Sequence, residues 1–388
     1  MNDWQKVKLS DVCNITSSKR IFAKEYQQFG VPFYRGKEII EKHNGNNVST
    51  ELYISKERYE EIKMKYDVPK RGDILLTSVG TLGVPWLVDE DEFYFKDGNL
   101  TWLRSNDTII PEFLYLWLNS SEAQNQIDMK CIGSTQKALT IDTLNSFELR
   151  LPSKDIQNKI CGILYPIIER MALNRRINQN LQEQAKALYS DLIVDKADET
   201  WIPGTLSDVA IVTMGQSPKG DTYNEDGIGT VFFQGRAEFG FRFPTRRLYT
   251  TEPKRMAQSN DALMSVRAPV GDMNVAYEDC CIGRGLSAIR SKDGHQSYVL
   301  YTMFDLRKQL DVFNGEGTVF GSINRDALNN MPISIPPKNV MDRFETLVSP
   351  MDAAIRSNYE EICRLEALRD SLLPRLMSGE LDVSGIEL

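Results

Sequence analysis

Residues 156–193 read IQNKICGILYPIIERMALNRRINQNLQEQAKALYSDLI, and residues 340–377 read VMDRFETLVSPMDAAIRSNYEEICRLEALRDSLLPRLM. In both stretches the apolar side chains recur at alternating steps of four and three residues, which is the heptad pattern of paired helices. Each stretch is far longer than the average helix of about 11 residues. The sequence therefore predicts two long helices that pack on each other as a coiled coil.

The predicted seam between the helices is mostly aliphatic. It comprises Ile160, Leu164, Ile167, Met171, Asn174, Leu181 and Leu188 in the first helix, and Phe344, Val348, Met351, Ile355, Asn358, Ile362, Leu365 and Leu372 in the second. The two asparagines occupy equivalent positions, where a polar side chain fixes the register of a coiled coil. Two alternatives stay open: the stripes pack onto their own globular bodies, and each helix kinks or restarts at Pro166 or Pro350.

The segments before the two helices also repeat. Trp4 and Leu9-Ser10-Asp11-Val12 recur as Trp201 and Leu206-Ser207-Asp208-Val209, and Phe33-Tyr34-Arg35-Gly36-Lys37 corresponds to Phe232-Phe233-Gln234-Gly235-Arg236. Two long copies of one unit predict four parts. These are a first globular body over residues 1–153, a first spacer helix with its linker over 154–200, a second body over 201–337, and a second spacer helix with a tail over 338–388.

Each body is predicted to belong to the α+β class. Short β-like runs such as Val31 to Tyr34 and Asp73 to Thr77 are separated by Gly, Pro, Asn and Asp clusters. Phe113 to Asn119 and Ser297 to Leu310 are typical of helices. Phe147 to Leu151 and Met331 to Ile335 are typical of strands that lead into the long helices.

Composition limits the function classes. The 388 residues carry a formal net charge of −8, so the chain as a whole does not indicate a polyanion partner, and any nucleic-acid surface must be local. No uncharged apolar run reaches the roughly 18 residues that a membrane span requires, and the N-terminus lacks an apolar signal segment. We expect a cytoplasmic protein without membrane association. Six cysteines without a C-x-x-C pair predict free thiols instead of zinc sites or disulfides.

Catalytic motifs are poorly represented. Two histidines, His43 and His295, leave little for a Ser-His-Asp or Cys-His pair, and neither lies in a motif. Residues 313–317 match the F-x-G-x-G shape of a nucleoside-cofactor loop, but the other copy of the repeat lacks it and no helix follows it. We therefore expect no catalytic residue, no metal site and no cofactor in this chain.

Basic residues gather at equivalent places in the two bodies. Residues 14–37 contain five basic side chains against one acidic, and residues 235–255 contain six against two. Such local patches can bind DNA phosphates, and arginine can also bond guanine edges. The candidate DNA-binding residues in these stretches are Lys19, Arg20, Lys24, Arg35 and Lys37 in the first body, and Arg236, Arg242, Arg246 and Arg247 in the second.

With these motifs in view, the chain resembles the specificity subunit of a type I restriction-modification system. The resemblance spans nearly all 388 residues. It depends on the repeated Trp-x4-Leu-Ser-Asp-Val, on the stretches Gly30 to Ile39 and Gly72 to Thr77, and on the Leu-x-Leu-Pro or Ile-x-Ile-Pro before each long helix. It implies two target recognition domains held apart by two long antiparallel helices with pseudo-two-fold symmetry, each domain reading one half of a split DNA target. In the second domain it adds four candidate DNA-binding residues, Gln216, Ser217, Lys219 and Arg267.

The resemblance also implies partners. These are double-stranded DNA, two modification subunits that bind S-adenosylmethionine and methylate adenine, and a restriction subunit that uses ATP and Mg. Two related bodies would meet successive major grooves about 34 Å apart, with helix length setting the unread spacer. A different class of function stays open, in which the chain is a coiled-coil scaffold that organises partner proteins and binds no DNA. Sequence-selective retention of a duplex would distinguish the two.

Overall fold

The computed structural model describes residues 4–46, 48–89, 92–131, 137–197, 199, 201–315 and 321–386. The chain divides into two compact units. Unit 1 comprises residues 1–179 and 356–388, and unit 2 comprises residues 180–355. The long helices α7 (Lys154–Tyr189) and α12 (Lys338–Met377) each contribute to both units, and each unit also holds one globular body.

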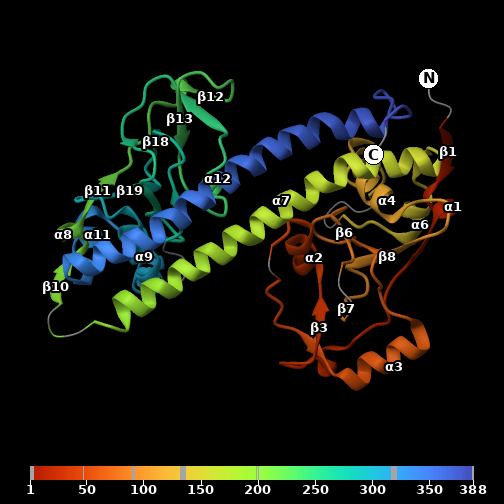
Figure 1. The fold of residues 1–388 in the computed structure, drawn as a ribbon, viewed down its shortest axis with the longest axis horizontal. Helices are drawn as coiled ribbons and strands as arrows, with labels where there is room; N and C mark the ends of the chain where they lie inside the picture. The colour runs from red at the N-terminus through yellow and green to blue at the C-terminus, as the bar shows by residue number, and fades with distance from the viewer. Residues whose placement is uncertain are drawn as a thin grey trace. The chain divides into compact units, whose positions relative to one another are not determined.

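Three sheets are seen in the described part of the first body (Figure 1). β1 (Gln5–Lys8) pairs with β9 (Glu148–Leu151), and a four-stranded antiparallel sheet has the order β2 (Cys13–Thr16), β8 (Leu100–Ser105), β5 (Ile74–Thr77), β6 (Pro85–Leu87). The third sheet has the order β4 (Tyr53–Ile54), β3 (Val31–Tyr34), β7 (Tyr94–Phe95), and its β3 and β7 are parallel. Helices connect the strands: α1 (Leu9–Val12), α2 (Gly36–His43), α3 (Lys56–Tyr66), α4 (Pro111–Leu118), α5 (Ser121–Lys130) and α6 (Ile141–Asn145).

The second body repeats the two-stranded and four-stranded sheets of the first, as the sequence predicted, but its remaining sheet has five strands instead of three. β10 (Ile202–Thr205) pairs with β20 (Pro332–Ile335), and the four-stranded sheet has the order β11 (Ala210–Met214), β19 (Leu286–Ser291), β16 (Ala262–Ser265), β17 (Met273–Val275). The remaining sheet has the order β12 (Tyr223–Asn224), β14 (Leu248–Thr250), β13 (Thr230–Phe233), β18 (Cys280–Ile282), β15 (Met256–Ala257). Here β13 and β18 form the parallel pair. The helices are α8 (Leu206–Val209), α9 (Gln296–Asp305), α10 (Arg307–Leu310) and α11 (Arg325–Asn329).

Within each unit the long helices pack antiparallel. In unit 1, Arg170 bonds Glu361 (Nε–Oε1 2.9 Å), Asn358 donates to Asn178 (2.8 Å), and Lys159 donates to the Ser384 carbonyl (2.7 Å). Residue numbers along the first segment therefore increase as those of their partners decrease, which is the antiparallel order. In unit 2 the Tyr189 ring contacts Phe344 (5.6 Å between centroids). Both helices continue through their prolines, so neither restarts at Pro166 or Pro350.

The predicted seam is buried or half-buried along its whole length. Asn174 is 1% exposed and donates to Glu361 (2.9 Å), so a polar contact at the predicted position ties the two helices together. The ends of the seam also contact the bodies. Ile160 and Leu164 share a core with Phe113 of α4 and Leu376 of α12. The helices therefore pair with each other and cover their bodies, and the two interpretations of the stripes are both correct in part.

A glycine at the same position of the repeat precedes β3 in the first body and β13 in the second. It allows a close approach of β3 to β4, and of β13 to β14. Gly30 has φ +136° and a Cβ there would lie 2.3 Å from the Ile54 carbonyl oxygen; Gly229 has φ +93° and a Cβ would lie 2.3 Å from the Thr250 carbonyl oxygen. Any other residue would force β3 away from β4, or β13 away from β14. The repeat thus preserves a close backbone approach at the start of each first parallel strand.

Gly30→Ala is expected to destabilise the first body by about 3 kcal/mol, because overpacking and a side chain at positive φ each cost about 1–3 kcal/mol. Gly36→Ala is the matched control, since a Cβ there would meet only the Thr77 methyl at 4.0 Å. Amide hydrogen exchange should show faster opening of β3 and β4 in Gly30→Ala and little change in the control. Equal exchange in the two variants would contradict the close approach.

The two histidines, one in each body, have opposite pKa shifts. Burial lowers the pKa of His43, with a smaller opposing effect from its bond to the Pro85 carbonyl (Nδ1–O 2.7 Å). Partial burial also acts to lower the pKa of His295, but a hydrogen bond to Asp342 (Nε2–Oδ1 2.7 Å) and an ion pair with Asp293 (Nδ1–Oδ1 2.9 Å) raise it overall. His295 therefore favours its charged form in the folded state, and His43 favours its neutral form.

These shifts predict opposite pH dependences. Because the folded pKa of His295 lies above its unfolded value of 6.5, its stabilising contribution is complete below that value and is lost as pH rises. For His43 the folded pKa lies below 6.5, so stability is lost as pH falls. Urea unfolding at about pH 5.5 and about pH 8 should show His295→Gln more destabilising at the lower pH, and His43→Gln more destabilising at the higher. The same trend in both variants would disprove these assignments.

Candidate nucleic-acid interface

The parallel strand pair ends at one edge of each body. Because both strands of a pair run in the same direction, the residues that follow them are neighbours. In the first body, Arg35-Gly36-Lys37 follow β3 and Lys96-Asp97 follow β7. In the second, Gln234-Gly235-Arg236 follow β13 and Gly283-Arg284-Gly285 follow β18. These two edges gather most of the predicted DNA-binding residues.

In the first body, segment 19–20 lies against the end of β7. The Lys19 amide donates to the Tyr94 hydroxyl (2.7 Å), and Arg20 bonds Asp97 (Nε–Oδ2 2.8 Å) while its side chain stays 67% exposed. The Lys19 ammonium lies over the Tyr66 ring (5.1 Å to the centroid). Lys24 is exposed on the short 3₁₀ turn η1 (Ala23–Glu25). The structure thus brings Lys19 and Arg20 to the edge where Arg35 and Lys37 begin α2.

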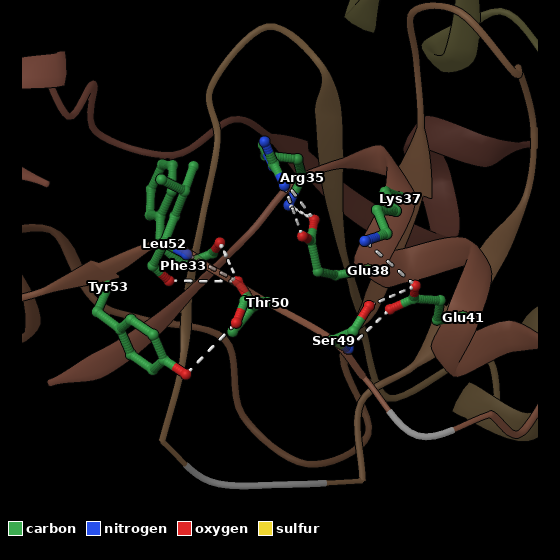
Figure 2. A network of polar contacts seen from close by, with 9 residues as sticks. All are labelled: Phe33, Arg35, Lys37, Glu38, Glu41, Ser49, Thr50, Leu52 and Tyr53. Carbon is green, nitrogen blue, oxygen red and sulfur yellow. Dashed lines mark hydrogen bonds and ion pairs between the residues drawn. The ribbon is translucent and has the colours of Figure 1, made fainter. Parts of the chain in front are cut away.

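Figure 2 shows the polar network at the start of α2. The carboxylate of Glu38, which is fully buried, accepts hydrogen bonds from the Arg35 amide (2.8 Å) and from the guanidinium (Nη2–Oε1 2.9 Å). Burial alone would raise the pKa of Glu38, but the bonds from Arg35 lower it overall, and the same bonds raise the pKa of Arg35. Both groups are therefore charged at neutral pH. Lys37 is paired more loosely, with its ammonium 3.7 Å from Glu41.

In the second body the same edge forms a small cavity of about 230 Å³. Its lining comprises Ser217, Gln234, Gly235, Arg236, Ser265, Arg267, Ala268, Arg284 and Gly285. Predicted residues from three distant segments thus meet at one place. The backbone is tightly packed here, because a Cβ on Gly215 would lie 2.1 Å from the Gly283 carbonyl oxygen. Ser217 accepts a hydrogen bond from the Arg284 amide (3.2 Å), which joins the two loops.

The arginines around this cavity differ in their ion pairs. Arg236 pairs with Asp272, which also binds Arg307 (Nη1–Oδ1 2.8 Å). Arg267 and Arg284 are exposed, and among the residues that the structure describes neither has an acidic partner. Gln216 and Lys219 are exposed on the loop that carries Ser217, and the Gln216 amide donates to the Ile282 carbonyl (2.9 Å). An uncompensated positive charge therefore lies at the mouth of the cavity.

Arg242 does not belong to this surface, and its inclusion among the DNA-binding residues was wrong. Its side chain is 4% exposed, forms an ion pair with Asp352, and donates to the Tyr301 hydroxyl (3.2 Å). A guanidinium held in this way cannot reach a phosphate. Arg246 and Arg247 are about half exposed but carry carboxylate partners, Glu278 (2.5 Å) for the first and buried Glu238 (2.6 Å) for the second.

Sequence reasoning missed Arg284, Gln234 and Glu38. Arg284 lies outside the basic stretch that was counted, although glycines flank it on both sides. Gln234 is uncharged, but the repeat already places it opposite Arg35. In the sequence, Glu38 is only an acidic residue close to a basic segment. Its contact with the Arg35 guanidinium depends on its burial, which the sequence does not show.

Other ligand classes find little support in the described part of the chain. No group of three His, Cys, Asp or Glu side chains among those residues could hold a metal ion. All six cysteines are free. Of the glycine pattern at 313–317, Phe313 and Asn314 end the 3₁₀ turn η5 (Asp311–Asn314), while residues 316 and 317 lie outside the described residues. No helix in the described regions is long and apolar enough to cross a membrane.

Comparison with known proteins agrees with this architecture. The family model for the type I restriction modification DNA specificity domain matches residues 1–183 and 198–358. The chain belongs to this family. The chain is 27% identical over 410 residues to the putative type I restriction enzyme MjaX specificity subunit of Methanocaldococcus jannaschii, covering 98% of this chain and 94% of that protein.

Two further proteins extend the comparison. It is 23% identical to the type I restriction enzyme HindI specificity subunit of Haemophilus influenzae, covering 98% of this chain and 100% of that one. The crystal structure of the type I restriction-modification S subunit from M. genitalium superposes with a TM-score of 0.64 at 15% identity, over 97% of this chain and 96% of that chain. At this identity the superposition supports the fold, with its two bodies and two long helices.

Proposed function

We propose that this specificity subunit binds a split double-stranded DNA target, with the edge around Arg35 and the cavity around Arg267 each contacting one half-site. The observation that carries the proposal is the equivalence of these two places, which both lie at the end of the parallel strand pair. Both are basic, yet their residues differ. Equivalent frameworks with different side chains suit a protein that reads two unlike half-sites.

The chain is proposed to contribute recognition alone. In its complex, two modification subunits would bind S-adenosylmethionine and methylate adenine, and a restriction subunit would use ATP and Mg, so that no cofactor binds this chain. The complex would act in the cytoplasm, where its DNA target lies. Residues 1–153 and 201–337 would form the two target recognition domains, and residues 154–200 and 338–388 would form the spacer helices and their flanking segments.

The deciding experiment maps methylated adenines across the host genome with this chain present and then deleted. Under the proposal, deletion removes methylation from one split motif and from no other. The control is a strain that keeps this chain but lacks the modification subunit, which should lose the same motif. If the modification subunit is expressed and the map does not change on deletion of this chain, the scaffold interpretation is favoured.

A further inference from the structure

The residue directly after the first parallel strand occupies a special position in each body. It is Arg35 after β3 and Gln234 after β13, and the repeat places the two at equivalent positions. We propose that this residue reads a base in each half-site, Arg35 reading a guanine and Gln234 reading an adenine. The inference rests on the proposed DNA-binding function and goes beyond it, because it assigns individual bases to individual side chains.

Arg35 is held in place by a carboxylate that solvent does not reach. Glu38 is 0% exposed and accepts from both Nη2 (2.9 Å) and, more weakly, Nε (3.5 Å) of Arg35. The Arg35 side chain is still 36% exposed, and no other hydrogen bond to its guanidinium is formed within the described residues. Glu38 bonds Nε and Nη2, so Nη1 is left for a ligand.

This arrangement exceeds what a helix cap requires. As the third residue of α2, Glu38 needs only the bond from the Arg35 amide (2.8 Å) to cap the helix. The additional bonds to the guanidinium fix the direction of the fork, which is costly to order in a free side chain. A fixed arginine fork matches the O6 and N7 acceptors of guanine, the commonest specific contact in the major groove. A buried carboxylate beneath it makes Glu38 a positioning residue.

The neighbouring Lys37 shows the contrast. Its side chain is 55% exposed and its ammonium lies 3.7 Å from Glu41, so it presents a loosely paired point charge. Lysine is suited to phosphate, because binding a phosphate requires positive charge but little directional hydrogen bonding. The two side chains at the start of α2 are thus fitted to different parts of DNA, and they provide a matched pair for a test.

Gln234 is presented on a rigid backbone. A Cβ on Gly283 would lie 2.9 Å from the Gln234 Cα, and a Cβ on Gly285 would lie 2.8 Å from the Gln234 carbonyl oxygen, which also accepts from the Gly285 amide (3.2 Å). The Gln234 side chain is exposed and makes no hydrogen bond within the described part of the body. Its amide can donate to N7 and accept from N6 of adenine.

Two features of the cavity support base contact by Gln234. Arg267 and Arg284, which lack acidic partners among the described residues, line the same cavity and can bind the phosphates on either side of a base. In addition, the ungapped repeat places Ala237 opposite Glu38, and the buried carboxylate next to it, Glu238, is bonded by Arg247 (2.6 Å) and forms no hydrogen bond with the Gln234 side chain among the described residues. The residue three positions after the proposed reading residue thus changes with it: it is Glu38 after Arg35 and Ala237 after Gln234.

The first test uses the assembled complex of this chain with its modification subunits and selects bound duplexes from a randomised split target. Arg35→Lys keeps the charge but loses the fork. We expect it to lower the preference for guanine at one position of the first half-site by about tenfold to hundredfold, with the second half-site unchanged. Lys37→Ala should instead weaken binding to all sequences alike. The unchanged second half-site confirms that the variant is folded.

The second test transplants the pair. Gln234→Ala should lose the adenine preference at one position of the second half-site, and Gln234→Arg with Ala237→Glu should convert that position to guanine. Selection by the unaltered chain tests the proposed function separately from the base assignments. If the unaltered chain selects no sequence, the proposed function fails. If it does, but Arg35→Lys and Gln234→Ala leave every base preference unchanged, the base-reading assignment is overturned while the proposed function stands.

Discussion

Asp352→Ala is expected to destabilise unit 2 by about 3–5 kcal/mol, because it leaves the buried Arg242 guanidinium without its counter-charge. The Arg242 side chain is 4% exposed and pairs with Asp352. Asp352 also accepts from the Ser297 hydroxyl (2.8 Å) and the Tyr301 hydroxyl (3.1 Å). One carboxylate on α12 thus accepts from three donors of the second body. Its loss removes the acceptor of the Ser297 and Tyr301 hydroxyls and the counter-charge of Arg242.

Urea unfolding followed in unit 2 provides the measurement, with two comparisons. Asp191→Ala removes an exposed ion pair with Lys196 (2.9 Å; the side chains are 60% and 57% exposed) and should cost less than about 1 kcal/mol. The double variant Arg242→Met with Asp352→Leu removes both buried charges and should recover much of the lost stability. If Asp352→Ala costs no more than Asp191→Ala, the buried pair does not hold the second body to α12.

Arg242 also shows where sequence reasoning fails. In the sequence it lies among other arginines and aromatic residues, as Arg246 and Arg247 do, and charge counting treats the three alike. Their environments differ because of Asp352, a residue more than a hundred positions away on another element. Partners this distant are set by tertiary packing, which a local count of charges does not contain.

The long helices were predicted well for the opposite reason. Their seam is specified by a period along the chain, and each apolar step, such as Ile160 to Leu164, follows from local spacing alone. The repeat was equally informative, because it aligned Arg35 with Gln234 before any contact was known. The repeat could not supply the burial of Glu38, or the finding that Arg284 has no acidic partner among the residues that the structure describes. These two facts distinguish an oriented side chain from a solvated one.

Removal of Arg267 and Arg284 is expected to cause the largest loss of DNA affinity among substitutions that preserve the fold. Both side chains are exposed at the cavity, and neither has an acidic partner in the part of the chain that the structure describes. A cation that is not neutralised by a nearby carboxylate attracts DNA phosphates most strongly. Arg236 is partly neutralised, because it pairs with Asp272, which also binds Arg307. Affinity for a cognate duplex should fall at least about tenfold in Arg267→Gln with Arg284→Gln.

Salt dependence distinguishes this loss from a general change in charge. Each phosphate contact contributes about 0.9 to the slope of log K against log salt, so the double variant should lower that slope by roughly 2. Lys196→Gln with Arg343→Gln removes the same net charge from exposed positions outside the cavity lining, and it should leave the slope nearly unchanged. Salt also screens the attraction between DNA and the net charge of the chain. A smaller salt slope in both double variants would therefore mean that overall charge, and not contact at the cavity, attracts the DNA. A smaller slope in the cavity variant alone would require that Arg267 and Arg284 contact phosphates directly.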